Sequence, residues 1–443
     1  MSRQGRVFSV ACLLRSAGQT VDQYRVTTCS DCGDTSELEY GYTTVKSVTG
    51  HATRCATCWK RRRERRELAT VMLPLITLVT LALLSGRWES GLPTIRIYPI
   101  LLLVLWAHEL GHATVGRALG LRVFEVVLGS GPRLVRARVG RTDIEARWFP
   151  FGGHTVMVPT RPARLRLALG IVAGPGANLA VALVALLVWP RSGSWVPPLV
   201  IANTIVLLGN LWPMQVATPL GPVRSDGLAL ATLIRSPRDH LDDADALLHA
   251  AESRAALLRG DAAAAVAWAD AGLRAHPDHR PLRHFLTVAL IRAGDIDAAR
   301  DHLRALLARD DAEPAERAVD LSNLAWADLM SGDPTLLDEA LVASEEAERR
   351  LAWHPAVKGT RGYALIESGR IEEGLTRVRR AYEAHTDRRD RATTLCVAAI
   401  GAMRIGDVAG GRSMLVAARR LDPACDLLER ATAEVEAVTA RVG

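Results

Sequence analysis

The sequence contains a histidine pair, His108 and His112, with the spacing of two metal ligands on a helix. Residues four apart on a helix project from the same face about one turn apart, so both imidazoles can reach one metal ion. Glu109 follows the first histidine and can act as a general base toward water at that metal. The surrounding segment, PILLLVLWAHELGHATVGRALG, is almost wholly apolar, and ionisable groups in such segments are usually functional. We therefore predict a hydrolytic metal centre, in preference to polar residues satisfied only by their own helix.

Four of the seven cysteines form two CxxC pairs, Cys29 with Cys32 and Cys55 with Cys58, and 22 residues separate the pairs. The intervening residues include Tyr, Thr and Val, which predict a β-hairpin. Two CxxC turns on a hairpin can close a tetrahedral thiolate site, and so small a unit needs a metal to hold it together. We therefore predict a structural zinc ion in a reducing compartment. The alternative is four unligated thiols.

The composition indicates a membrane core with soluble parts attached. The chain has 443 residues, which leaves room for two or three domains; 49% of them are hydrophobic and 23% are charged. The net charge of +7 arises largely from arginine runs beside apolar segments, so we interpret it as a membrane-topology signal and expect no nucleic-acid partner. The first residues lack the long apolar core of a signal peptide, and we expect no cleavage there.

Four apolar runs predict four membrane-spanning helices, at residues 68–84, 99–120, 165–189 and 196–214. A basic block at residues 60–66 and nine arginines from Arg117 to Arg164 place those segments in the cytoplasm. The loops at residues 86–96 and 190–194 carry few charges and are expected outside. The sequence thus predicts a multi-pass protein of the cell membrane, in contact with the lipid bilayer, with both termini cytoplasmic. The HELGH motif then lies near the cytoplasmic face.

Several motifs follow one another between residues 99 and 230: HELGH, GSGPRL, FPFGGH, AGPGANL and an N-x-x-P…S-D-G segment. Alternating β-branched residues around the second and third motifs predict paired strands at the membrane surface. In this order the motifs resemble the site-2 protease family of intramembrane zinc metallopeptidases, over roughly a third of the chain. The resemblance implies that His108, His112 and Asp226 bind a catalytic zinc ion and that Glu109 is the general base.

The resemblance also implies substrate contacts. The FPFGG strand, which contains Phe151, Gly152 and Gly153, would offer an edge to which an unwound substrate pairs. Asn178 in AGPGANL would contact the substrate or its oxyanion. The chain departs from the family pattern at the third ligand, because Asp226 arrives late, after PLGPVR, and is followed by one glycine. No other acidic residue lies between the N-x-x-P motif and Asp226.

From about residue 239 onward the sequence repeats. Five turn glycines recur at intervals of 34, 38, 37 and 37 residues: Gly260, Gly294, Gly332, Gly369 and Gly406. Each precedes an amphipathic run such as IDAARDHLRALLARD, and the pattern resembles degenerate tetratricopeptide repeats. Such helix pairs stack into a solenoid whose concave groove can hold a cytoplasmic protein partner. The alternative is a helical bundle without a binding role.

These observations predict a mainly α protein with a small β element at the membrane surface. We expect a zinc-ribbon-like unit and basic linker at residues 1–66, a transmembrane metalloprotease core at 67–238 and an α-solenoid at 239–443. The expected function is cleavage of a membrane-anchored protein within or next to its transmembrane segment, in regulated intramembrane proteolysis, with one catalytic and one structural zinc ion. The alternative is an inactive membrane scaffold whose repeats recruit partner proteins. A transporter would need more spans.

Overall fold

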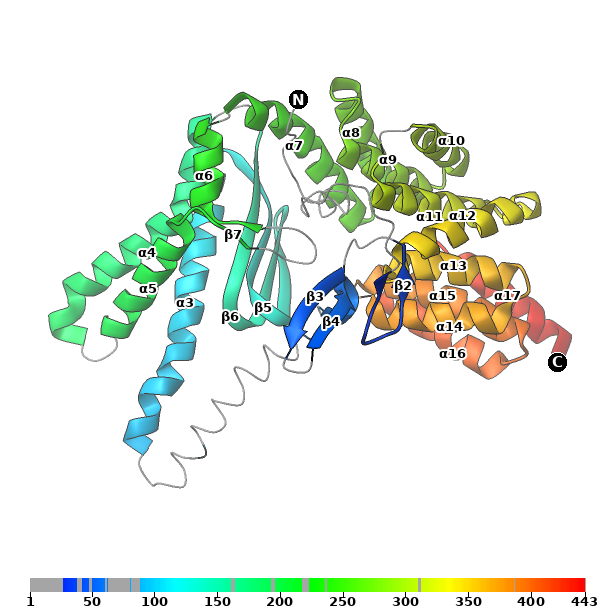
Figure 1. Ribbon diagram of the computed structural model, residues 1–443, viewed down its shortest axis with the longest axis horizontal. Coiled ribbons are helices and arrows are strands. Elements are labelled where there is room, and N and C mark those ends of the chain that lie inside the picture. The colour runs from blue at the N-terminus through cyan, green and yellow to red at the C-terminus, as the bar shows by residue number, and fades with distance from the viewer. Residues whose placement is uncertain are drawn as a thin grey trace. The chain divides into compact units, whose positions relative to one another are not determined.

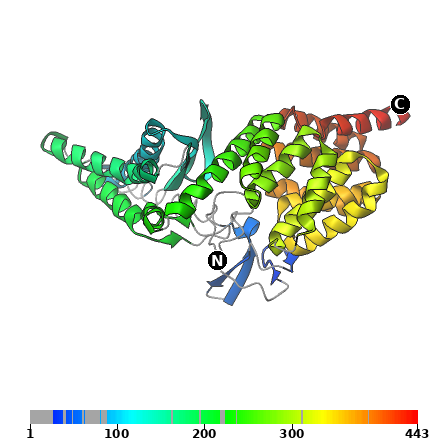
Figure 2. The same ribbon diagram turned by 90° about the horizontal axis from the view of Figure 1, so that it is seen from above.

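The computed structural model describes residues 27–37, 42–47, 50–59, 62, 80, 88–160, 164–192, 196–216, 223–235, 237–309, 312–385 and 387–442. These residues belong to two compact units (Figures 1 and 2). The first unit lies within Lys60–Ala251, and the second combines Phe8–Trp59 with Glu252–Gly443. Two segments that are far apart in the sequence therefore form one unit.

Three helices form the framework of the first unit: α3 (Trp88–Ala118), α4 (Arg164–Ser192) and α5 (Val196–Leu211). By length and apolar composition, Tyr98–Ala118 and Arg164–Val188 are able to cross a membrane. The helix α5 is also apolar but has only 16 residues. The predicted span at residues 68–84 lies outside the described residues, apart from residue 80. Two of the four predicted spans are therefore found.

Large apolar side chains on α4 and α5 point away from the protein. Leu187 on α4 is 78% exposed, and Ile205 on α5 is 65% exposed. Contiguous exposed residues of this size are unfavourable in water, whereas lipid tails solvate them well. The outer faces of these helices therefore suit a bilayer.

The predicted loop conformation of residues 86–96 is wrong from Trp88 onward, because α3 begins at Trp88, whereas the location of these residues outside stays a prediction. The first turns of this helix contain Gly91 and Pro93, two residues that disfavour a helix interior. A helix already nucleated by a long apolar run extends at little further cost. A proline in the first two turns also removes few internal hydrogen bonds.

A long, bent hairpin follows α3 and consists of β5 (Leu121–Val139) and β6 (Thr142–Pro159). Residues 125–128 of β5 pair with residues 153–156 of β6 on one side and with residues 143–146 on the other. The second half of β6 therefore lies at the edge of the sheet. Buried Val123 and Val126 pack with Ala113 of α3, which holds the sheet against the histidine helix. The predicted paired strands are confirmed.

The second unit contains a series of helices from residue 262 onward, in which each packs against the next (Figure 1). The helix α7 (Pro237–Arg259) runs into this unit from the first. The others are α8 (Ala262–Ala275), α9 (Arg280–Ala293), α10 (Ile296–Leu307), α11 (Pro314–Ser331), α12 (Leu337–Leu351), α13 (Pro355–Glu367), α14 (Ile371–Ala384), α15 (Arg388–Arg404), α16 (Val408–Leu421) and α17 (Leu428–Val442).

The five predicted turn glycines all follow helices and have φ between 73° and 87°. Glycine adopts this left-handed conformation without the steric cost of a Cβ atom. At three of the turns the next residue, Asp261, Asp295 or Asp407, caps the following helix by accepting a backbone amide hydrogen bond. The predicted helix–turn–helix repeats are confirmed.

The N-terminal ribbon comprises the described residues from 27 to 59. It contains four strands: β1 (Thr27–Thr28), β2 (Thr35–Ser36), β3 (Tyr42–Ser47) and β4 (Gly50–Cys55). The antiparallel pairing of β3 with β4 confirms the predicted hairpin. Cys29 and Cys55 share one buried cluster with Leu351 and Trp353 of the repeats. The ribbon therefore shares a core with the repeat helices, an association that the sequence did not predict.

Candidate metal centre

Three ligand-type atoms converge beside α3. The Nε2 atoms of His108 and His112 lie 3.3 Å apart. The Oδ2 atom of Asp226 lies 3.2 Å from the first nitrogen and 3.4 Å from the second. Both imidazoles are buried. The structure thus brings together the three residues that the family resemblance named as ligands.

Hydrogen bonds behind each imidazole determine which ring nitrogen faces the centre. The Nδ1 atom of His112 donates to the carbonyl of Gly170 at 2.8 Å, because a carbonyl can only accept. The Nδ1 atom of His108 donates to Oδ1 of Asn178 at 2.7 Å. The Asn178 oxygen faces this histidine because the Asn178 amide group donates to Val104 and Asn203. In both neutral rings, Nε2 therefore presents a lone pair toward Asp226.

The convergent atoms fit a tetrahedral zinc ion. Three acceptors pointing at one another repel unless a cation lies between them, and Oδ2 of Asp226 is buried without a hydrogen-bond donor among the described residues. Zinc binds nitrogen and oxygen at about 2.0–2.1 Å, which gives tetrahedral edges of about 3.3–3.4 Å. The three separations of 3.2, 3.3 and 3.4 Å match these edges.

A short hairpin delivers Asp226 to the histidines. After α5 the chain forms β7 (Gln215–Val216), which pairs with β8 (Val223–Arg224) directly before α6 (Asp226–Arg235). Ser225 anchors the end of the hairpin, since its hydroxyl donates to the Trp212 carbonyl at 2.6 Å. The pairing of β7 with β8 brings the two ends of this segment together. This explains how a ligand that arrives late in the sequence still meets the pair.

Glu109 lies buried beside the centre. The hydroxyl of Thr155 on β6 donates to its Oε2 atom at 2.7 Å, which positions the carboxylate. A Cβ atom built on Gly153 would lie 2.8 Å from Oε1 of Glu109, so the strand backbone passes directly beside the carboxylate. The sequence reasoning missed Thr155, because its contact with α3 depends on the packing of the hairpin.

The predicted substrate-binding residues occupy two different places. Gly152 is exposed and Gly153 is half-buried on the edge strand, whereas the side chain of Phe151 lies outside the described part of the structure. Asn178 is fully buried, and its Nδ2 atom donates to the Val104 carbonyl and to Oδ1 of Asn203. All its polar atoms are therefore engaged within the protein. The structure places Asn178 behind His108, in a different role from the predicted substrate contact.

A steric requirement explains one glycine of the AGPGANL motif. Gly174 faces His112, and a Cβ atom at this position would lie 2.2 Å from the Nε2 atom of that histidine. Any side chain at this position would therefore displace the imidazole. The motif brings α4 close to α3 with a glycine and orients a ligand with an asparagine.

The four cysteines of the ribbon form a second candidate metal site. Their sulfur atoms all lie within 4.8 Å of one another, and those of Cys32 and Cys55 are 3.8 Å apart. Zinc–sulfur bonds of about 2.3 Å give tetrahedral edges of about 3.8 Å. Burial and the neighbouring thiols raise the pKa of Cys58 to about 12, since clustered thiolates need a compensating cation. The donor set fits a closed zinc site.

Comparisons with known proteins agree with this geometry. Residues 97–414 match the sequence profile of Peptidase family M50, over more than half of the chain. A Clostridium perfringens protein that carries the provisional name zinc metalloprotease is 41% identical over 55 residues, which are 12% of this chain and 16% of that protein. The match therefore spans about a sixth of the relative's length.

Two of the solved structures that resemble the chain are similar to it at low sequence identity. A thermophilic TPR protein of Thermus thermophilus is 16% identical, with 43% of this chain and 98% of that chain covered and a TM-score of 0.36. The Pseudomonas aeruginosa pilF protein is 16% identical, with 58% of this chain and 98% of that chain covered and a TM-score of 0.31.

Proposed function

Because the chain belongs to Peptidase family M50, we propose that it is a zinc endopeptidase that cleaves a membrane-anchored protein within or next to its transmembrane segment. The observation that carries this proposal is the convergence of His108, His112 and Asp226 beside the buried carboxylate of Glu109. These groups lie on or against a helix long and apolar enough to cross a membrane. The cell membrane, with both termini in the cytoplasm, is the proposed location.

In this proposal, His108, His112 and Asp226 hold the catalytic zinc. When bound there, zinc acidifies water and polarises the peptide carbonyl that is attacked. Glu109 accepts the proton of the attacking water and passes it to the leaving amine. Thr155 holds the carboxylate toward the reacting groups through its 2.7 Å hydrogen bond. Asn178 and the Gly170 carbonyl keep both imidazoles in the ligating orientation.

The substrate would bind as an added strand. A transmembrane helix satisfies its own backbone hydrogen bonds, so its peptide bonds become accessible only after it unwinds. The second half of β6, with Gly152 and Gly153, lies at a sheet edge and can supply new backbone partners. Gly153 lies next to Glu109, so a strand paired there would run past the catalytic carboxylate.

The remaining parts would regulate this activity. We propose that the four cysteines hold a structural zinc ion and that the repeats bind a cytoplasmic protein partner, as stacked helix pairs often do. Control of substrate access through these parts would make the reaction a step of regulated intramembrane proteolysis.

The test compares membrane proteomes of cells that produce the wild-type chain, Glu109→Ala or Glu125→Gln. Mass spectrometry should find peptides that end within transmembrane segments only with the wild-type chain and with Glu125→Gln. Glu125 is the matched control, because it is an acidic residue on β5 that does not belong to the centre. Identical peptide ends in all three samples would refute the peptidase and favour a scaffold.

A further inference from the structure

The ribbon docks on the repeat helices through backbone hydrogen bonds. The amide of Glu37 donates to the Arg349 carbonyl at 2.9 Å, and the amide of Ala352 donates to the Ser36 hydroxyl at 3.0 Å. The first bond satisfies one of the last carbonyls of α12, which have no partner within the helix. The contact is therefore directional, because both sides supply a donor and an acceptor.

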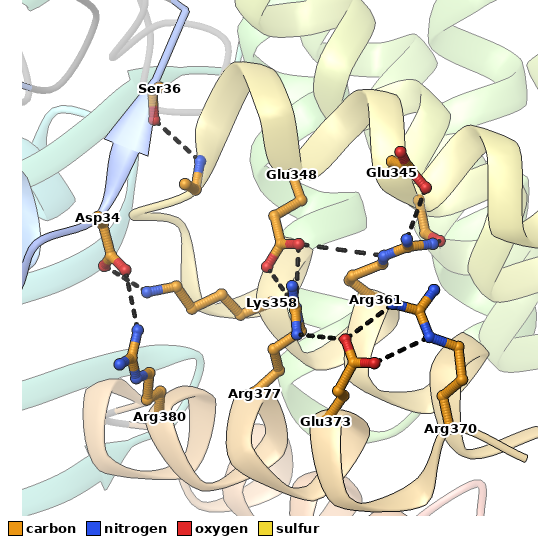
Figure 3. A network of polar contacts seen from close by, with 12 residues as sticks. Asp34, Ser36, Glu345, Glu348, Lys358, Arg361, Arg370, Glu373, Arg377 and Arg380 are labelled. Carbon is orange, nitrogen blue, oxygen red and sulfur yellow. Dashed lines mark hydrogen bonds and ion pairs between the residues drawn. The ribbon is translucent and has the colours of Figure 1, made fainter. Parts of the chain in front are cut away.

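A carboxylate of the ribbon lies at the centre of the contact. Asp34 accepts a hydrogen bond from the ammonium of Lys358 on α13, and its other oxygen lies 3.4 Å from the Arg380 guanidinium on α14 (Figure 3). The Lys358 side chain is only 8% exposed and that of Asp34 only 10%. A buried ammonium group is unfavourable unless it is paired. Asp34 provides that pairing across the contact.

The neighbouring cations are neutralised within the repeats themselves. Arg361 pairs with Glu345, and Arg377 pairs with Glu348 (Figure 3). By contrast, the ion pairs of Lys358 and Arg380 among the described residues are both with Asp34 of the ribbon. These two cations together form a receptor for a carboxylate on the surface of α13 and α14.

The geometry of the first cysteine turn holds Asp34 in place. The amide of Cys29 donates to the Asp34 carbonyl at 2.8 Å, and the amide of Gly33 donates to the Cys29 carbonyl at 2.9 Å. A ribbon this small has little core of its own, so a metal at the cysteines would maintain this turn. Metal binding and docking would then stabilise each other by the same factor.

We propose that Lys358 and Arg380 form a carboxylate-binding site of the repeat domain and that the chain's own metal-loaded ribbon occupies it through Asp34. The ribbon is thus a metal-dependent clasp on the repeats. An acidic segment of another protein would compete for the same site once the metal is lost. The inference rests on the proposed structural metal of the cysteines and is independent of peptidase activity.

Hydrogen exchange of the full-length protein in detergent tests the clasp, with mass spectrometry of peptides that contain Glu37 and Ala352. The variants are Asp34→Asn, Cys29→Ser, Lys358→Met and the double variant Asp34→Asn/Lys358→Met. Arg370→Gln is the matched control, because Arg370 forms an exposed ion pair within the repeats, with Glu373 on α14.

We expect Asp34→Asn and Cys29→Ser to accelerate exchange at both reporter amides together, by about tenfold or more, while α9 keeps wild-type exchange. Arg370→Gln should match the wild type. The double variant should exchange more slowly than Asp34→Asn alone, because removing both buried partners costs less than leaving one unpaired charge. Faster exchange in the ribbon with unchanged exchange at Ala352 would overturn the proposal.

A second measurement uses a fluorescent ten-residue glutamate peptide as the probe. It should bind the Cys29→Ser protein and not the zinc-loaded wild type, and adding Lys358→Met to Cys29→Ser should abolish binding. Equal binding of the peptide to the zinc-loaded wild type and to the Cys29→Ser protein would show that the ribbon does not occupy the carboxylate-binding site. If zinc binds the cysteines but exchange at Glu37 and Ala352 does not change together, the clasp is overturned and the proposed peptidase is unaffected. If exchange at the two amides is coupled but the protein cleaves no substrate, the proposed peptidase is overturned and the clasp stands.

Discussion

The Oδ1 atom of Asn178 lies 2.7 Å from Nδ1 of His108, on the side of the imidazole that faces away from Asp226. This contact selects the ring tautomer whose Nε2 lone pair faces the centre. The asparagine is itself locked, because both its amide hydrogens are used by Val104 and Asn203. A ligand of the candidate centre is thus oriented by a chain of buried hydrogen bonds.

We expect Asn178→Ala to weaken zinc binding by about 10- to 100-fold, since losing the partner behind a ligating histidine frees its ring and tautomer. Chelator competition measures the zinc affinity directly. Asn178→Asp keeps an acceptor facing His108 but loses both amide donors to Val104 and Asn203, so it should restore only part of the affinity. If the two variants bind zinc equally, Asn178 does not act through His108.

Glu109→Ala should leave the protein folded and its active-site zinc bound while lowering cleavage by about 100- to 10,000-fold. The three ligands remain intact, and only the proton acceptor is lost. Zinc content together with turnover of a reconstituted membrane substrate measures both properties. Undiminished turnover would rule out Glu109 as the general base.

The purified wild-type chain should contain two zinc ions, one at each cluster of ligand-type residues. Asp226→Ala should lower the content to about one by weakening the centre beside α3, whereas Cys29→Ser should remove the other ion. Elemental analysis after dialysis counts the metal. Wild-type content and activity in Asp226→Ala would exclude this aspartate as the third ligand.

Cysteines introduced at Ser90 and Gly193 should react with a membrane-impermeant thiol reagent on intact cells, whereas a cysteine at Ser236 should not. The arginine-rich segments favour a cytoplasmic location for residues 60–66 and 117–164, which leaves the first two positions outside. Labelling is measured by mass shift before and after cell lysis. The opposite labelling pattern would invert the proposed topology.

The repeat domain should lose stability as the pH falls from about 6.5 to about 4. Packing removes water from the imidazoles of His284 and His354 and lowers the pKa of each to about 4, and the nearby His385 adds to the shift at His354. In the unfolded chain the same histidines bind a proton near pH 6.5. As the pH falls, the unfolded state is therefore protonated first and becomes more favourable relative to the folded state.

For this pH effect, the expected loss is roughly 1–3 kcal/mol for each histidine, and His284→Gln should reduce the dependence on pH. Hydrogen exchange of the repeat helices at pH 7.5 and pH 5, corrected for intrinsic rates, measures the change. Equal stability at the two pH values would show that these histidines titrate alike in both states.

Local patterns were sufficient to predict several features. The proximity of His108 and His112 follows from the pitch of one helix. The positions of the turn glycines follow from a sequence period equal to the length of one helix pair. The CxxC spacing likewise predicted the cysteine cluster. Each of these signals involves residues whose relation is set by a short stretch of backbone.

The tertiary structure decided the contacts between distant segments. It brought Asp226 to the histidines through the β7–β8 hairpin, placed Asn178 behind His108 and set Thr155 against Glu109. It also joined Asp34 to Lys358, 324 positions away. No sequence period relates such residues, because their proximity depends on how whole helices and strands pack. The sequence therefore determined which groups are available for chemistry, and packing determined which of them meet.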